Sequence, residues 1–243
     1  MIQNISLIVT RELRGYFATV SGYLILAAHL LISGLLFNAY AVGNRAKFSQ
    51  AVLEDFFFFS SGMAIITAVL LSTRLIAEER QTQTLVLLHT APVTEREVIY
   101  AKHLSALAFF TLTLLASVYL PALVFVNGKI SIGHILSGYL GLFLLGSACI
   151  AIALLASCWT HSQVNAGVLG GVIITLLLVA WMAARVSDEP IRGVLNYLAL
   201  HNQHFRGLSR GIFRWADLAY YLGVTLFFLE CAVRSLASWR WRE

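Results

Sequence analysis

Histidine side chains in two stretches of the sequence could support chemistry. His201 and His204 stand three positions apart in LALHNQHF, a spacing that could direct two imidazoles at one metal ion. No Cys, Asp or Glu within a few residues completes such a site, so we interpret the stretch as a polar loop and expect no bound metal. His29 stands in a long apolar run. A neutral histidine hydrogen-bonded between helices is the ordinary interpretation there, and a substrate or proton path is the alternative.

Other potentially reactive side chains have simple structural interpretations. Glu230 precedes Arg234 by one helical turn, which predicts a local ion pair. The three cysteines form no CxxC pair and are interpreted as small buried residues without a disulfide; they are Cys149, Cys158 and Cys231.

The sequence lacks the common catalytic and nucleotide-binding motifs. It has no GxSxG, no HExxH and no pair of carboxylates inside an apolar segment. The stretch NGKIS at 127–131 lacks the upstream glycine of a P-loop and the hydroxyl residue after its lysine. We therefore expect no catalytic residue, no cofactor and no enzymatic activity in this chain itself. Nothing indicates nucleic-acid binding.

The composition is that of an all-α integral membrane protein. Of the 243 residues, 59% are hydrophobic and 12% are charged, about half the charged share of a soluble domain. Four ranges contain no Lys, Arg, Asp or Glu: 15–44, 56–73, 103–128 and 130–184. Because a helix needs about 20 apolar residues to cross a bilayer, the last range is long enough for two spans. With a final span after Asp217, the predicted helices are 20–42, 56–76, 104–126, 132–157, 164–184 and 216–236.

Residues 1–19 precede the first predicted span and are amphipathic. Ile2, Ile5, Val9 and Leu13 fall on one narrow arc of a helix, and polar and basic residues fall on another. This pattern predicts a helix that lies on the membrane surface. The alternative is a plain basic flank to the first span.

Lysine and arginine set the expected orientation. With the N-terminus in the cytoplasm, nine basic residues lie inside and eight outside, five of the eight in the range 185–214. We expect both termini inside the cell, in a multi-pass membrane protein.

The segment 77–102, AEERQTQTLVLLHTAPVTEREVIYAK, interrupts two apolar runs. It holds seven of the 29 charged side chains. Pro92 disfavours helix at the residue before it, and Thr94 with Glu97 forms a T-x-x-E capping box that starts the next helix. The apolar run 85–88 has no reason to be exposed in an isolated loop. We therefore predict a structured cytoplasmic hairpin that a partner protein covers.

The fifth predicted span contains GVLGG, with Gly167 and Gly171 four positions apart. This spacing allows two helix backbones to approach closely. The motif fits packing within one subunit and packing across a dimer equally well.

The segment after the second span resembles that of type-2 ABC transporter permeases, in which paired acids, a basic residue, Gly-Thr, Leu-Leu, Pro-Val and Gly-Lys follow in order. The matching residues here are Glu78, Glu79, Arg80, Thr84, Leu85, Leu87, Leu88, Pro92, Val93 and Lys102. Gln83 stands where glycine is usual, and Ala101 stands before the lysine. HFRGLSRGIFRWADLAYYL at 204–222 and RELRGYFATVSGYL at 11–24 are similar to the gliding-motility-associated branch of these permeases.

The resemblance implies an architecture for the whole chain as one permease domain. Six spans form half of a membrane pathway, and a second permease copy or a paralogue forms the other half. The hairpin would couple each half to a separate ATPase subunit, which holds ATP and Mg. The implied coupling residues are Glu78, Glu79, Arg80, Thr84, Leu85, Leu87, Leu88 and Pro92. The implied divisions are 1–19, 20–76, 77–102, 103–184, 185–215 and 216–243.

The resemblance also implies that the segment between spans five and six folds back into the outer membrane face. His204, Arg206, Arg210 and Arg214 would then lie at outer headgroups or contact a periplasmic-domain partner. The family-level expectation is an exporter. The alternative is a membrane anchor in a mechanotransmitting complex through which no substrate passes.

Overall fold

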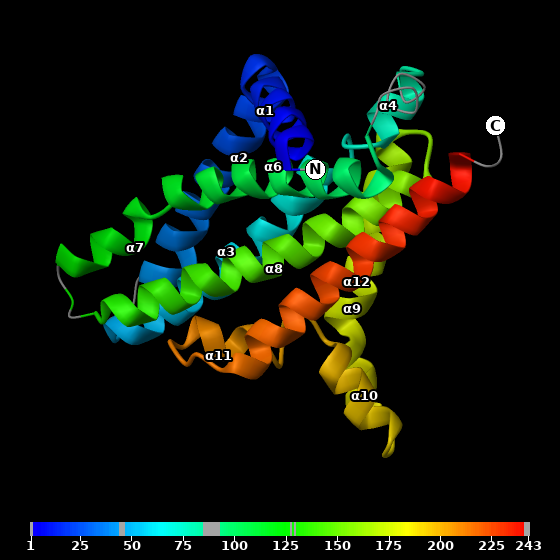
Figure 1. The fold of residues 1–243 in the computed structure, drawn as a ribbon. Helices are drawn as coiled ribbons and strands as arrows, with labels where there is room; N and C mark the ends of the chain where they lie inside the picture. Colours follow the sequence, from blue (N-terminus) through cyan, green and yellow to red (C-terminus); the bar gives the residue numbers. More distant parts are fainter. Residues whose placement is uncertain (1, 44–46, 85–92, 127, 129, 241–243) are drawn as a thin grey trace.

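A computed structural model describes residues 2–43, 47–84, 93–126, 128 and 130–240 (Figure 1). These residues form helices and no strand. In chain order the longer helices are α1 (Ile2–Ala18), α2 (Val20–Leu36), α3 (Ser49–Ser72), α6 (Glu95–Ala116), α8 (Ile132–Trp159), α9 (Gln163–Val186) and α12 (Trp215–Arg240). The shorter ones are the π-helical η1 (Phe37–Val42), α4 (Ala77–Gln81), α7 (Tyr119–Leu123), the 3-10 helix η2 (Val124–Val126), α10 (Ile191–Leu198) and α11 (Phe205–Ser209).

Six helical stretches of the described residues are long and apolar enough to cross a membrane. They are 20–42, 49–81, 95–123, 132–159, 163–186 and 215–238. The predicted all-α fold with six spans is confirmed. Two of the helices that hold the predicted spans begin earlier than those spans, at Ser49 against 56 and at Glu95 against 104.

Helix α8 is the centre of the bundle and packs against α3, α6, α9, α11 and α12. It is the most buried of the six stretches. Its glycines permit this, because the rings of Phe57 and Phe110 occupy the space that a Cβ would need at Gly138 and Gly146. Any larger residue at these two positions would push α3 or α6 away from α8.

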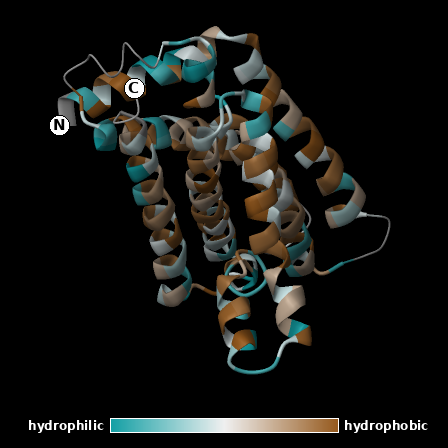
Figure 2. Cartoon of the chain, turned by 90° about the vertical axis from the view of Figure 1, so that its right-hand side faces the viewer, coloured by the Kyte–Doolittle hydropathy of each residue, from teal (hydrophilic) through white to brown (hydrophobic). Residues whose placement is uncertain are grey.

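The bundle has two distinct ends. The α4 end carries α1, α4 and the last turns of α12, which lie at the same end of the bundle in Figure 1 and in Figure 2. The α11 end carries α7, α10 and α11. Six crossings by these helical stretches would place the two ends of the chain on one side of a membrane.

Helix α1 confirms the predicted N-terminal helix and packs on α6. The ring of Tyr16 stacks on Phe109 with centroids 4.9 Å apart, and its hydroxyl donates to the Leu71 carbonyl at 3.1 Å. These contacts fix the C-terminal end of α1 to α3 and α6.

Two expectations for single residues met different outcomes. His29 is buried and its Nδ1 lies 2.8 Å from Thr67 Oγ1 on α3, which confirms a histidine hydrogen-bonded between helices. The prediction of a local ion pair between Glu230 and Arg234 was wrong. Glu230 instead contacts Arg96 of α6 at 3.1 Å, because α6 and α12 pack side by side there.

Candidate coupling site

Helix α4 continues the chain beyond α3 after a short turn and is attached to the end of α8. The backbone amides of Ile76 and Ala77 donate to Ser157 Oγ at 3.2 and 2.9 Å, and this hydroxyl donates to the Thr73 carbonyl at 3.3 Å. Ser157 is fully buried. One side chain of α8 therefore satisfies amides that start α4, which would otherwise lack partners.

Gln83, just after α4, has an unusual backbone conformation. Its φ of +58° lies in the left-handed region, where glycine is free of the steric cost that other residues meet. This is the position at which the permease pattern carries glycine. The turn that glycine would favour is thus present here with glutamine.

The predicted capping box starts α6. Thr94 Oγ1 accepts from the Glu97 amide at 3.3 Å, and Glu97 Oε2 accepts from the Thr94 amide at 2.9 Å. Between Thr84 and Val93 the chain lies outside the described residues, and the predictions for Leu85, Leu87, Leu88 and Pro92 fall there.

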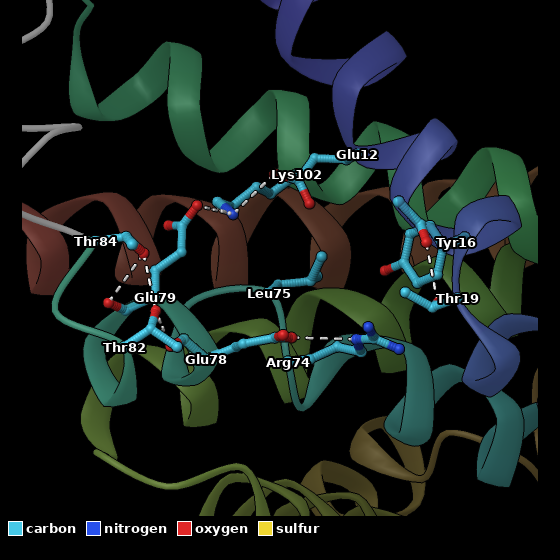
Figure 3. Close-up of a pocket in the computed structure, with 11 residues that line it drawn as sticks. Glu12, Tyr16, Thr19, Arg74, Leu75, Glu78, Glu79, Thr82, Thr84 and Lys102 are labelled. Carbon is cyan, nitrogen blue, oxygen red and sulfur yellow. Dashed lines mark hydrogen bonds and ion pairs between the residues drawn. The ribbon is translucent and has the colours of Figure 1, made fainter.

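Lys102 joins three elements at the α4 end (Figure 3). Its ammonium Nζ lies 2.9 Å from Glu79 Oε1 on α4 and 3.3 Å from Glu12 Oε1 on α1, while Lys102 itself belongs to α6. The lysine side chain is 1% exposed. Arg11 closes the network, with Nη2 at 2.7 Å from Glu12 and 3.3 Å from Glu79. Two cations thus balance two carboxylates, as a buried charge requires.

A second set of contacts surrounds Arg74 at the end of α3. Its Nε lies 3.2 Å from Glu78 Oε2 of α4, and its Nη1 donates to the hydroxyl of Ser21 in the first turn of α2. The guanidinium also lies 5.8 Å from the ring centroid of Tyr16, within the range of a cation–π contact. Arg74 therefore connects α4 to the start of α2.

The network favours its charged state. Burial alone would raise the pKa of Glu12, but Lys102 and Arg11 outweigh it and the pKa lies below the ordinary value of a glutamate. The hydrogen bond to Glu12 raises the pKa of Arg11. Glu12 is therefore ionised at neutral pH, and the network keeps both pairs of charges.

A cavity of about 290 Å³ lies beside these contacts. Tyr16 and Thr19 line it from the α1 side, Arg74 from the end of α3, and Glu78 and Thr84 from the α4 side (Figure 3). The cavity therefore lies between α1 on one side and, on the other, the segment that bears the predicted coupling residues.

The opposite end of the bundle is organised by His204 and Asp217. Nδ1 of His204 lies 2.9 Å from Asp217 Oδ1, its Nε2 lies 3.2 Å from the Tyr197 carbonyl, and its ring stacks on Tyr220 at 3.8 Å. Both His204 and Asp217 are buried. Arg214 Nε lies 3.7 Å from the second Asp217 oxygen. This cluster ties the segment before α12 to the first turns of α12.

Helix α11 folds back into the bundle beside this cluster. Ser137 Oγ donates to the Leu208 carbonyl at 3.0 Å, and His134 Nε2 lies 2.8 Å from the Ser209 carbonyl. Arg210 Nε lies 2.6 Å from Glu54 Oε1 at the start of α3. Helix α11 is therefore packed against α3 and α8, whereas α10 (Ile191–Leu198) packs on α9.

A family model described as an ABC-2 family transporter protein matches residues 34–229. The chain belongs to the ABC-2 transporter family. It is thus a membrane permease component of an ABC transporter and not the nucleotide-binding subunit, and the family implies an ATPase partner. No curated protein matches the sequence.

In this permease both acidic residues of the predicted coupling set contact cations of the bundle; Glu79 is largely buried, and Glu78 keeps 42% of its side chain exposed. Glu78 and Glu79 contact Arg74 and Lys102, although the sequence grouped them with residues that meet the ATPase. Arg80 is half-buried, and Thr84 is exposed at the edge of the cavity. The acids thus hold α4 in place, and among the described residues of the coupling segment 81–84 are exposed.

Sequence reasoning missed the positions of Lys102, Glu12 and Asp217 in these sites. Lys102 entered the permease pattern only as a matching residue, and its two carboxylates come from residues 23 positions before it and 90 positions before it. Asp217 was the last charge before the final span. A charged residue at the edge of an apolar run was the available signal in both cases.

His201 and His204 do not converge on a common site, and Gly167 and Gly171 have different surroundings. His201 Nε2 lies 2.7 Å from Ser61 Oγ, whereas both ring nitrogens of His204 face other acceptors, so the two rings share no partner. No group of three potential metal ligands occurs among the described residues. A Cβ at Gly167 would meet Thr73 at 3.1 Å, and one at Gly171 would meet nothing within 4 Å.

Proposed function

We propose that this permease forms half of an export-type ABC transporter, in a bacterial inner membrane with both termini in the cytoplasm. A separate ATPase subunit acts on residues 78–92, and a second permease copy completes the membrane pathway. The observation that carries the proposal is the attachment of α4. Through Lys102, Arg74 and Ser157 it is tied to α1, α6, α2 and α8, so a force on α4 reaches the bundle.

The exposed face of α9 supports a dimer. This helix is the least buried of the six candidate spans among the described residues. Its exposed side chains include Val164, Val168 and Leu176, and Gly171 lies on an open face as well. An apolar face with an uncovered glycine allows close approach of a second helix.

The coupling step needs two states with different contacts. A partner that binds both states equally shifts nothing, so ATP binding must change what the ATPase contacts at residues 81–92. Movement of α4 then tilts α3 and α6, which flank it in the chain. This changes the pathway between the two permease copies.

The mechanotransmitting anchor is a second candidate, and the α11 end favours it. Phe213 and Trp215 form an exposed aromatic pair with centroids 5.1 Å apart, and Arg206 is exposed earlier in the same segment. Aromatic and arginine side chains are enriched at protein interfaces. A periplasmic-domain partner would bind there. Its recovery with the permease, together with a tightly packed dimer interface, would favour this function over transport.

The full chain, purified with its natural partners from native membranes, tests the coupling role. We expect an ATPase subunit to copurify and hydrolyse ATP. Glu79→Ala removes the contact with Lys102, and Leu88→Asp places a charge in the apolar run. Each variant should either lose the ATPase or separate its hydrolysis from transport. The matched control is Glu54→Ala at the α11 end. Normal assembly and normal transport in both variants would refute the coupling role.

A further inference from the structure

Helix α1 is connected to α4 by ionic contacts and to the bundle by ionic and apolar ones. In the middle of the helix Arg11 contacts Glu79 of α4 directly, and Glu12 contacts Lys102 of α6, which in turn contacts Glu79. The apolar contacts involve Tyr16, one turn later, which stacks on Phe109 and bonds to the end of α3. A helix rises 1.5 Å per residue, so roughly 6 Å separates these two points of attachment along its axis.

Helix α1 is held to the bundle on both sides of these two residues. Near its start Asn4 Nδ2 donates to Glu97 Oε1 of α6 at 3.5 Å, and Ile8 and Leu13 pack against the core. Arg11 and Glu12 are where a displacement of Glu79 would reach α1, so the helix would move as one rigid element.

The turn between α1 and α2 is too tight to absorb such a movement. The Gly22 amide donates to the Thr19 carbonyl at 3.2 Å, and a Cβ at Gly22 would collide with the Tyr16 carbonyl oxygen. Arg74 also links the first turn of α2 to Glu78 of α4. The start of α2 is thus held to the same short helix as α1.

We propose that Lys102 is a positioning residue that makes α1 a second moving element of the coupling site. Its ammonium binds Glu12 of α1 and Glu79 of α4 together, so the two helices move as one body when the ATPase displaces α4. Force then leaves the coupling segment by two routes, through α3 and α6 into the bundle and through α1 to the start of α2. This inference rests on the proposed function, because it assumes that an ATPase acts on α4.

The double variant Arg11→Gln, Glu12→Gln tests the proposal. It removes the charged contacts of α1 with Lys102 and Glu79, keeps the Lys102–Glu79 pair, and leaves the net charge unchanged. Arg11 is 59% exposed and Glu12 lies at the edge of the cavity, so we expect the variant to fold. The matched control is Glu54→Gln, Arg210→Gln, which neutralises a pair of opposite charges at the α11 end.

Hydrogen–deuterium exchange of the permease–ATPase complex would supply the measurement, without nucleotide and after trapping with ATP and orthovanadate. In the wild type and the control we expect trapping to change exchange in residues 78–84 and in α1. In the double variant the change in 78–84 should persist, and the change in α1 should fall by at least half.

Two results would overturn the inference. One is a change in α1 as large in the double variant as in the wild type. The other is a rise of tenfold or more in α1 exchange before nucleotide is added, which would mean that the charges only hold α1 in place. Failure of the proposed function looks different, since then no ATPase would copurify or trapping would leave residues 78–84 unchanged in the wild type.

Discussion

The ammonium of Lys102 lies 2.9 Å from the carboxylate of Glu79, inside a span that apolar residues otherwise dominate. A lysine buried this deeply is stable only with an opposite charge beside it. Glu79 is its nearest partner, and Glu12 and Arg11 complete the set. The charged stretch between the second and third spans is therefore partly folded into the protein.

Replacing Lys102 with Met should destabilise the permease by about 2–3 kcal/mol. The change leaves Glu12 and Glu79 close together with only Arg11 between them, and removing one partner of a buried pair is costly. Thermal unfolding of the purified protein measures the loss. Lys47→Met is the matched control, because the pair of Lys47 with Asp55 is more exposed and worth less than about 1 kcal/mol. Equal losses in both variants would contradict the importance of burial at Lys102.

Gln83→Gly should leave the coupling segment intact, whereas Gln83→Val should weaken it by about 1–2 kcal/mol. Glycine adopts the left-handed conformation freely, and a β-branched side chain is penalised there. Hydrogen exchange of residues 78–84 is the appropriate measurement, because the effect is local. Gln81→Val makes the same change at an exposed helical position and serves as control. Greater loss of protection with glycine than with valine would be inconsistent with the observed turn.

Asp217→Ala should loosen the folded-back segment at the α11 end. The change leaves the buried ring of His204 and the guanidinium of Arg214 without their carboxylate. A hydrogen bond to a charged group contributes about 1.5–3 kcal/mol, so trypsin should cleave at Arg206, Arg210 and Arg214 about tenfold faster or more. Asp188→Ala alters an exposed aspartate before α10 and should leave the cleavage rate unchanged. Unaltered cleavage of the Asp217 variant would show that packing alone holds the segment.

His201 should make the permease less stable in mild acid. Burial lowers its pKa to about 4, against about 6.5 in an unfolded chain. The unfolded state therefore takes up a proton first. The stabilising contribution is complete above pH 6.5 and is lost as the pH falls toward 4. Between pH 7.5 and pH 5 the loss from this group is about 2 kcal/mol.

His201→Gln isolates this contribution, since an amide can still hydrogen-bond to Ser61 and does not titrate. The unfolding midpoint of the variant should fall less than that of the wild type over the same pH interval. Parallel curves for the two proteins would exclude His201 as the source of the acid sensitivity.

The sequence predicted the spans well, because an unpaired charge is costly in a membrane and charge-free runs are therefore informative. The helices extend beyond the predicted spans where charges are paired. Helix α3 begins before Glu54 and Asp55, which meet Arg210 and Lys47 at the α11 end. Helix α6 continues past Lys102 because carboxylates from α1 and α4 surround it.

Local motifs were also predictable, whereas contacts between distant segments were not. The capping box of Thr94 and Glu97 depends on a three-residue spacing along the chain. The pairs of Glu230 with Arg96 and of His204 with Asp217 depend on how helices pack. No spacing along the chain encodes them, and the helical spacing of Glu230 and Arg234 indicated the wrong partner.

Photo-crosslinking from the coupling segment tests the central claim most directly. A benzophenone amino acid at exposed Gln81, two positions before the left-handed turn, would be irradiated in native membranes, with the same probe at exposed Phe213 of the α11 end as control. The coupling role predicts a crosslink from position 81 to a protein with a nucleotide-binding P-loop, and none from position 213. A crosslink to that ATPase from position 213 and not from position 81 would contradict it.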